Sequence, residues 1–110
     1  MENCIFCKII KGEVSSEKAH HEDDRVVSFP DYQPVQPGHT LVVPAEHYRW
    51  FWELPDNIAN DLFKVARKLA RELKEKTGAD YIQLSIVGKD VPHMHMHLIP
   101  RFLKDNPPTI

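Results

Sequence analysis

Three histidines alternate with two methionines near the end of the chain, in the run His93-Met-His-Met-His97. Successive side chains of a β-strand point to opposite faces, so the three imidazoles are expected to share one face. Met94, Met96 and Leu98 then share the other face, which is apolar and suited to a core. Same-face neighbours on a strand lie about 7 Å apart. The run therefore predicts a strand over 93–99 that carries a row of imidazoles.

Two kinds of chemistry fit such a row. In the first, His93, His95 and His97 are ligands of a catalytic metal, because alternate histidines on a strand are a good start for a zinc or iron site. In the second, the central His95 is a nucleophile, and a neighbouring histidine fixes its tautomer through a hydrogen bond to the other ring nitrogen. Phosphorus is the natural electrophile for an imidazole. The residues alone leave both interpretations open.

Cys4 and Cys7 form a C-x-x-C pair and are the only cysteines in the sequence. Two thiolates are half of a tetrahedral zinc site, and histidines would have to supply the other half. A redox-active pair is an alternative, but thioredoxin-like motifs follow a strand of a βαβ unit, and only three residues precede Cys4. Two free thiols are the third interpretation.

Length and charge restrict the class of protein. A chain of 110 residues is expected to form a single domain over 1–110. The net charge of −2 argues against nucleic-acid polymers as partners and against a basic membrane-surface module. No apolar run approaches the roughly 20 residues that span a bilayer, and no secretory signal is apparent. We therefore expect a cytoplasmic protein that does not bind membranes.

The rest of the chain predicts an α+β fold. Apolar residues at steps of three and four indicate an amphipathic helix over 56–76, with Asp56 as its N-cap and Gly78 as its stop. One long helix, one short helix and several strands without βαβ alternation favour an antiparallel sheet. The short helix is expected over 5–11 and a polar loop over 13–24. The remaining strands are expected over 25–29, 40–43 and 81–87, and a flexible tail over 105–110.

The histidine run and three further segments resemble the histidine triad (HIT) family of nucleotide hydrolases and transferases. The segments 3–13, 22–31 and 37–44, the last with His47 beyond it, are similar to the bacterial-type branch with an N-terminal C-x-x-C. The resemblance covers nearly the whole chain. It implies the HIT-like fold, with one long and one short helix, and a homodimer whose antiparallel sheets join into one.

The resemblance also implies a reaction. His95 would attack the α-phosphorus of a nucleoside-monophosphate conjugate and form a covalent nucleotidyl-histidine. His97 would hydrogen-bond behind it, His93 would line the phosphate or leaving-group side, and His39 would complete the site. The substrates would be purine nucleotides or nucleoside phosphoramidates, cleaved by a phosphoramidase or a dinucleotide-hydrolase type of enzyme. No organic cofactor is expected.

Further residues are implied to bind the nucleotide. Asp31 would accept hydrogen bonds from the ribose hydroxyls, and Phe6, Ile9 and Tyr32 would pack on the base. Three of these residues have an alternative in the fold itself, because Phe6 and Ile9 also suit a core and Asp31 also suits a cap of the Pro-rich turn.

The loop before the triad departs from the family pattern. Lys89 stands where glutamine is usual, and Asp90 stands where serine or threonine is usual. Lys89 offers a positive charge to a phosphate, whereas Asp90 repels a phosphate or acts on a leaving amine. These changes leave a third hypothesis open, in which the protein binds nucleotides with weak catalysis.

The C-x-x-C pair finds partners through the same resemblance. Cys4 and Cys7 would join His47 and His93 around a structural zinc ion. His93 would then not be a free imidazole, the reaction would rest on the other three histidines, and the zinc would brace the strand. The segment Trp50–Trp52 has three consecutive aromatic residues, which suit either a dimer interface or a cap on the core.

Overall fold

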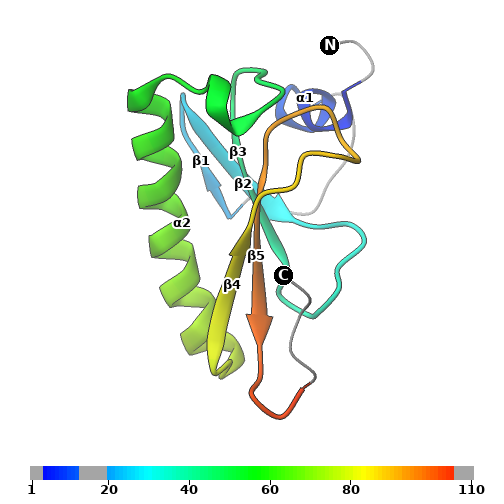
Figure 1. Cartoon of the computed structure of the whole chain (residues 1–110), viewed down its shortest axis with the longest axis vertical. Coiled ribbons are helices and arrows are strands. Elements are labelled where there is room, and N and C mark those ends of the chain that lie inside the picture. Colours follow the sequence, from blue (N-terminus) through cyan, green and yellow to red (C-terminus); the bar gives the residue numbers. More distant parts are fainter. Residues whose placement is uncertain (1–3, 13–19, 106–110) are drawn as a thin grey trace.

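The computed structural model describes residues 4–12 and 20–105. Its centre is a five-stranded antiparallel sheet with the strand order β1-β2-β3-β5-β4 (Figure 1). The elements in chain order are α1 (Ile5–Ile10), β1 (His21–Glu22), β2 (Val26–Pro30), β3 (Thr40–Pro44), the 3-10 helix η1 (Phe51–Glu53), α2 (Asp56–Thr77), β4 (Tyr81–Ser85) and β5 (Met96–Arg101). The predicted α+β class with an antiparallel sheet is confirmed.

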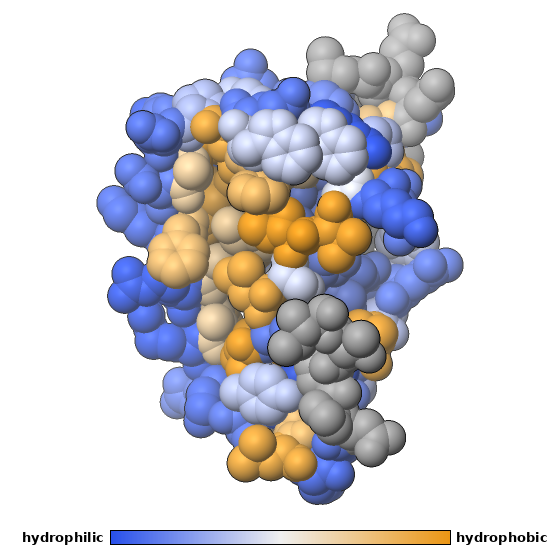
Figure 2. Space-filling model, in the orientation of Figure 1, coloured by the Kyte–Doolittle hydropathy of each residue, from blue (hydrophilic) through white to orange (hydrophobic). Residues whose placement is uncertain are grey.

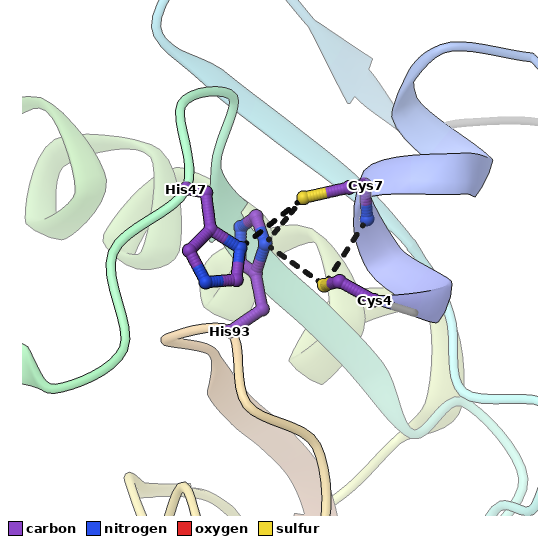
Figure 3. A group of neighbouring side chains, drawn as sticks. All are labelled: Cys4, Cys7, His47 and His93. Atoms are coloured by element: carbon purple, nitrogen blue, oxygen red, sulfur yellow. Dashed lines mark hydrogen bonds between the residues drawn. The ribbon is translucent and has the colours of Figure 1, made fainter. Parts of the chain in front are cut away.

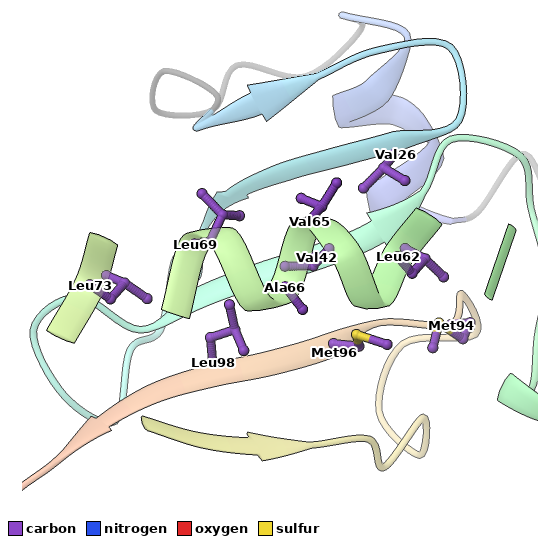
Figure 4. Packing of buried hydrophobic residues seen from close by; sticks show 10 residues of the cluster. All are labelled: Val26, Val42, Leu62, Val65, Ala66, Leu69, Leu73, Met94, Met96 and Leu98. Carbon is purple, nitrogen blue, oxygen red and sulfur yellow. The ribbon is translucent and has the colours of Figure 1, made fainter. Parts of the chain in front are cut away.

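The long helix α2 covers one face of the sheet. The apolar stripe predicted from the sequence is buried there, against side chains of the central strands and the methionine face of the histidine run (Figure 4). The buried cluster contains Val26, Val42, Leu62, Val65, Ala66, Leu69, Leu73, Met94, Met96 and Leu98. Burial of each large member stabilises the fold by roughly 1.5–3 kcal/mol.

The ends of α2 agree with the sequence at one terminus only. Gly78 ends the helix in the left-handed conformation, with φ of 71°, as a stop signal should. At the other end the N-cap position belongs to Pro55, and Asp56 lies inside the first turn. There its carboxylate faces the positive end of the helix dipole, so the residue stabilises the terminus without capping it.

The opposite face of the sheet is covered only in part. The short helix α1 packs at one end of this face, where Phe6 meets Val27, Phe29, Leu41 and Val43. The rest of the face lies beside the loop over 86–95, drawn in orange near α1 in Figure 1. Because no helix covers this part in the described residues, it is where a cavity forms.

The sequence predicts a strand over 93–99, but β5 begins only at Met96, three residues later. Continuing the register between β3 and β5 would place Met94 opposite Pro44, which has no N–H to donate to the ladder. The N–H of Met94 donates instead to the carbonyl of Tyr48, over 2.6 Å. His93 and His95 therefore lie on an irregular segment just before the strand.

Two further expectations concern the polar stretch and the tail. A two-residue strand, β1, lies within the expected loop over 13–24 and pairs with β2, while residues 13–19 lie outside the described part. The expected flexible tail lies outside it from residue 106 onward. In the part that the structure describes, no helix is both long and apolar enough to cross a bilayer.

Candidate functional site

The imidazole of His95 has a fixed tautomer. Its Nδ1 lies 2.7 Å from the backbone carbonyl oxygen of His93, which can only accept a hydrogen bond. Nδ1 must therefore carry the proton, and Nε2 keeps a free lone pair. His95 is buried, yet it lines a cavity on the open face of the sheet. This arrangement suits a nucleophile.

A second hydrogen-bonded chain runs through His39 and His97. The N–H of Val35 donates to Nδ1 of His39 over 3.2 Å, so Nε2 of His39 carries the proton when the ring is neutral. Nε2 of His39 lies 2.9 Å from Nδ1 of His97 and donates its proton to that nitrogen. A carboxylate oxygen of Asp31 lies 3.3 Å from the same Nε2 of His39. A neutral His97 then has its remaining proton on Nε2.

Burial keeps this chain uncharged near neutral pH. Desolvation, with smaller contributions from His95 and His39, lowers the pKa of His97 to about 4. Burial also lowers the pKa of His39, although Asp31 opposes the shift. Neutral imidazoles are the form that the two assigned tautomers require.

The triad differs in two ways from the arrangement expected from the sequence. The group behind His95 is the peptide carbonyl of His93, whereas His97 is bonded to His39. The rings of His95 and His97 are 4.8 Å apart, closer than the spacing of about 7 Å on a regular strand. His95 precedes the β5 ladder, so regular strand spacing does not set the position of its ring.

The cavity has a volume of about 390 Å³ and collects most of the expected site residues. Of the residues expected to take part in catalysis or to bind the nucleotide, the lining includes Phe6, Asp31, Tyr32, His39, Lys89, Asp90, His95 and His97. Ile9 is not part of the lining and packs instead beside the Phe6 cluster, as its alternative in the core expected. His93 is not part of it either, since its ring faces the cysteines.

The sequence analysis missed an apolar wall of this cavity. Leu41 and Ile99 line it, and they lie on the same face as His97: Leu41 is its cross-strand partner and Ile99 is two residues further on. Strand periodicity is a signal that would have found both residues. The other missed residues are Gln33, Val35, Ser85, Val87, Gly88 and Val91, which come from loops or strand ends without such a period.

Phe6 joins the short helix to the histidines. It is 2% exposed, and its ring meets His95 edge-on at 5.0 Å, His93 at 6.0 Å and Phe29 at 5.6 Å. The residue therefore belongs both to the core and to the cavity wall, so its two interpretations from the sequence are compatible.

Cys4, Cys7, His47 and His93 meet at the start of α1 and form what we call the cysteine–histidine cluster (Figure 3). Their ligand atoms all lie within 4.8 Å of one another. Nδ1 of His93 is 3.4 Å from each sulfur, and Nδ1 of His47 is 3.2 Å from Sγ of Cys7. The structure thus brings together the four residues that the sequence assigned to a metal.

The cluster fits a tetrahedral zinc ion. Bond lengths of about 2.3 Å to sulfur and 2.0–2.1 Å to nitrogen place neighbouring sulfur and nitrogen ligands about 3.5 Å apart, close to the spacing found here. Nε2 of His93 donates to the carbonyl oxygen of Pro44 over 2.9 Å, which leaves Nδ1 unprotonated toward the sulfurs. Burial lowers the pKa of His93 to about 4 and so favours the neutral, ligating form.

The thiols of the cluster favour the same conclusion. Burial, with the adjacent Cys4 thiol, raises the pKa of Cys7 to about 11. Lys11 opposes this shift only in part, and a zinc ion would supply the charge that stabilises two thiolates. The donor set, two sulfurs and two nitrogens, is typical of structural zinc.

The triad does not converge as one set of metal ligands. Among the described residues, neither group with metal-ligand spacing contains His95. The second group is Asp31, His39 and His97, but the hydrogen bond from Val35 leaves the proton of His39 on the nitrogen that would face a metal. A hydrogen-bonded chain explains that group better than a metal site does.

The aromatic segment after β3, residues 50–52, lies at the surface, with Trp50 partly buried. The rings of Trp50 and Trp52 stack at 5.2 Å, and Trp50 packs under Gly88, a residue with φ of 75° in the loop that lines the cavity. Trp52 is 67% exposed and Phe51 is 52% exposed. Figure 2 shows apolar side chains gathered on this face of the molecule, over β4.

The sheet, the buried imidazoles and the cavity together define a histidine triad domain. Residues 12–104 match the family model described as the HIT domain. The chain therefore belongs to the HIT family.

Curated relatives agree with this assignment. An uncharacterized HIT-like protein of Methanocaldococcus jannaschii is 42% identical over 93% of this chain and 81% of its own length. Adenosine 5'-monophosphoramidase HNT1 of Candida albicans is 38% identical over 90% of this chain and 70% of its own length. Adenylylsulfatase HINT3 of Arabidopsis thaliana is 32% identical over 94% of this chain and 54% of its own length.

Solved structures share the fold. A protein of Streptococcus mutans superposes with a TM-score of 0.91 at 37% identity, covering 100% of this chain and 73% of that one. A zinc-bound histidine triad family protein of Mycobacterium smegmatis superposes with a TM-score of 0.87 at 28% identity, covering 96% of this chain and 79% of that one. The HIT-like fold expected from the sequence is confirmed.

Proposed function

We propose that this protein hydrolyses conjugates of nucleoside 5'-monophosphates by attack of His95 on the α-phosphorus. The observation that carries the proposal is the hydrogen bond between Nδ1 of His95 and the carbonyl of His93, because it leaves Nε2 as a nucleophile at the cavity. Two relatives named as an adenosine monophosphoramidase and an adenylylsulfatase support this class of reaction.

The reaction has two displacement steps. In the first, the bond from Nε2 of His95 to phosphorus forms, the bond from phosphorus to the leaving group breaks, and an amine leaving group takes up a proton from water. In the second, water attacks phosphorus, the bond to Nε2 breaks, a proton is released and the nucleoside monophosphate leaves. The ring is cationic in the intermediate, and the carbonyl of His93 stabilises its Nδ1–H.

His39 and His97 stabilise the reacting phosphoryl group in this proposal. Because Nδ1 of His97 accepts from His39, its Nε2–H is left to donate, and His97 lines the cavity beside His95. A neutral donor held in place by buried hydrogen bonds stabilises the developing charge without reorganising. Lys89 adds the positive charge of the lining.

The same cavity receives the nucleoside in this proposal. Asp31 offers a carboxylate to the ribose hydroxyls, while Phe6, Tyr32, Leu41 and Val35 provide apolar surface for the base. We propose a purine as the base because a large flat ring can cover such an extended apolar wall.

We also propose a structural zinc ion in the cysteine–histidine cluster. The zinc-bound relative supports it, as do the ligand spacing and tautomers of this chain. When bound, zinc supplies the charge that keeps both thiolates deprotonated. A reducing compartment such as the cytoplasm would preserve these thiols.

We further propose a homodimer formed through β4. In the described part of the chain this strand has a neighbour on one side only, and an unpaired edge is suited to pairing with a second copy. Leu84 is 41% exposed on β4 and Val87 is 63% exposed just after it, and Figure 2 shows apolar side chains gathered over β4. A joined sheet would cover this surface.

The test is hydrolysis of adenosine 5'-phosphoramidate, followed as release of AMP. The His95→Ala variant should lose activity by several orders of magnitude, whereas His20→Ala, which changes an exposed histidine, should retain it. Full activity of the His95→Ala variant would show that the nucleophile is misassigned. Tight nucleotide binding without turnover would instead favour a binding protein with weak catalysis.

A further inference from the structure

The nucleophile lies outside the sheet that positions the rest of the site. The ladder between β3 and β5 reaches only as far as Met96, so His95 and the two residues before it have no strand partner. Their positions must come from other contacts. We call residues 93–95 the nucleophile segment.

Each residue of the nucleophile segment contacts a ligand of the cysteine–histidine cluster or a residue next to one in the chain. The ring of His93 is itself part of the cluster and also donates to the carbonyl of Pro44. The N–H of Met94 donates to the carbonyl of Tyr48, the residue that follows the ligand His47. The ring of His95 packs edge-on against Phe6, which lies between the ligands Cys4 and Cys7.

One more contact belongs to the loop that lines the cavity. The N–H of His93 donates to the carbonyl of Val91 over 2.8 Å, within a tight turn. This bond spans two residues and does not reach another element, so it cannot fix the nucleophile segment relative to the sheet. Two contacts do tie the segment to the fold away from the cluster: Met94 is buried in the core under α2, and the ring of His93 bonds to Pro44 at the end of β3. The other contacts that hold His93 and His95 come from α1 and from the segment after β3, which meet at the cluster (Figure 3).

His93 connects the cysteine–histidine cluster to the proposed nucleophile, His95. The side chain of His93 faces the sulfurs, and its main-chain carbonyl accepts the hydrogen bond from Nδ1 of His95. A rotation of this peptide would remove the acceptor from Nδ1. The proton of a neutral imidazole would then be free to move to Nε2, the nitrogen that must stay unprotonated.

We propose that His93 is a positioning residue through which occupation of the cysteine–histidine cluster sets the tautomer of His95. Metal in the cluster holds the ring of His93, the held ring orients its carbonyl, and the carbonyl keeps the proton on Nδ1 of His95. The inference rests on the proposed function for its catalytic meaning, but its structural content does not depend on turnover.

The experiment observes the tautomer directly. Protein labelled with ¹⁵N in histidine is loaded with zinc, and long-range ¹H–¹⁵N correlation spectra are recorded at one fixed pH before and after the metal is removed with a chelator. The zinc-loaded protein should show widely separated Nδ1 and Nε2 shifts for His95, with Nδ1 protonated. After metal removal the two shifts should move toward each other as the tautomers exchange, and zinc should restore them.

Two variants separate this effect from a general loss of stability. His47→Gln removes the partly exposed ligand and leaves the other three, so zinc should bind more weakly and the His95 shifts should return only at higher zinc concentration. Leu73→Ala weakens the core at the end of α2 that is distant from Met94 (Figure 4), and should lower the melting temperature without changing the tautomer. The His47→Gln variant also keeps the test valid if the chelated wild type unfolds.

The proposal is overturned if folded, metal-free protein keeps the separated His95 shifts of the zinc-loaded form, or if Leu73→Ala moves them as much as metal removal does. A kinetic comparison distinguishes this failure from that of the proposed function. Tautomer changes that follow the metal in a protein without hydrolytic activity would refute the function alone. Hydrolysis through His95 with a tautomer indifferent to the metal would refute the coupling alone.

Discussion

Replacing His97 by asparagine should make the protein less sensitive to acid. Burial lowers the pKa of His97 from 6.5 to about 4, so the folded state takes up its proton less readily than the unfolded state does. The stability is therefore complete above pH 6.5 and is lost as the pH falls toward 4. Asparagine can accept the hydrogen bond from His39 but does not titrate.

The pKa shift sets the size of the effect. A difference of 6.5 minus about 4 corresponds to about 3.4 kcal/mol when the loss is complete, and about 2.6 kcal/mol of it is lost by pH 4.5. Because His97 is partly exposed and solvent screens its charge, we reduce the expected loss to about 2 kcal/mol.

The assay is urea unfolding of wild type and His97→Asn at pH 7 and pH 4.5. Between the two pH values the free energy of unfolding of the wild type should fall by about 2 kcal/mol more than that of the variant. Acid effects on the cysteine–histidine cluster are common to both proteins and cancel in this difference. His20→Asn, at an exposed position, should lose as much stability as the wild type. Equal losses for wild type and His97→Asn would refute the assignment of a neutral, partly buried His97.

Three further changes test the cavity and the sheet edge. Asp31→Asn should lower kcat/KM for ribonucleotide conjugates about 10-fold or more, because a charge-assisted hydrogen bond to the ribose is lost. The same change should hardly affect kcat/KM for 2'-deoxy analogues. Equal losses for both substrates would contradict a ribose contact. Asp90→Asn should improve cleavage of adenylyl sulfate relative to adenosine 5'-phosphoramidate, because one negative charge near an anionic leaving group is removed; an unchanged ratio would argue against this. Leu84→Lys should shift the protein from dimer to monomer in analytical ultracentrifugation, and an unchanged sedimentation coefficient would exclude β4 as the interface.

Periodic features of the sequence predicted the elements that have a buried face. The stripe of α2 and the apolar side of the histidine run are both in the core, since a period of 3.6 or 2 determines which side chains can be buried together. The strand β1 has only two residues and therefore no period. The early end of the β5 ladder depends on Pro44, a residue distant in sequence, and no local pattern indicates it.

The sequence predicted which residues form the candidate site better than it predicted which hydrogen bonds they make. The four members of the cysteine–histidine cluster come together as expected from the family resemblance. The partner of His95 is a backbone carbonyl, which every residue has, so side-chain identities could not reveal it. Ile9 and Phe6 lie on the same short helix, but only the position of α1 on the sheet decides that Phe6 reaches the cavity and Ile9 does not.

The most direct test of the central claim is to trap the covalent intermediate. Zinc-loaded protein is mixed with adenosine 5'-phosphoramidate, quenched within milliseconds under alkaline denaturing conditions, and its peptides are mapped by mass spectrometry. We predict one adenylyl group on the tryptic peptide 90–101, attached to His95, and none in His95→Ala. Turnover without any histidine adduct, or an adduct on His97, would contradict the assignment of Nε2 of His95 as the nucleophile.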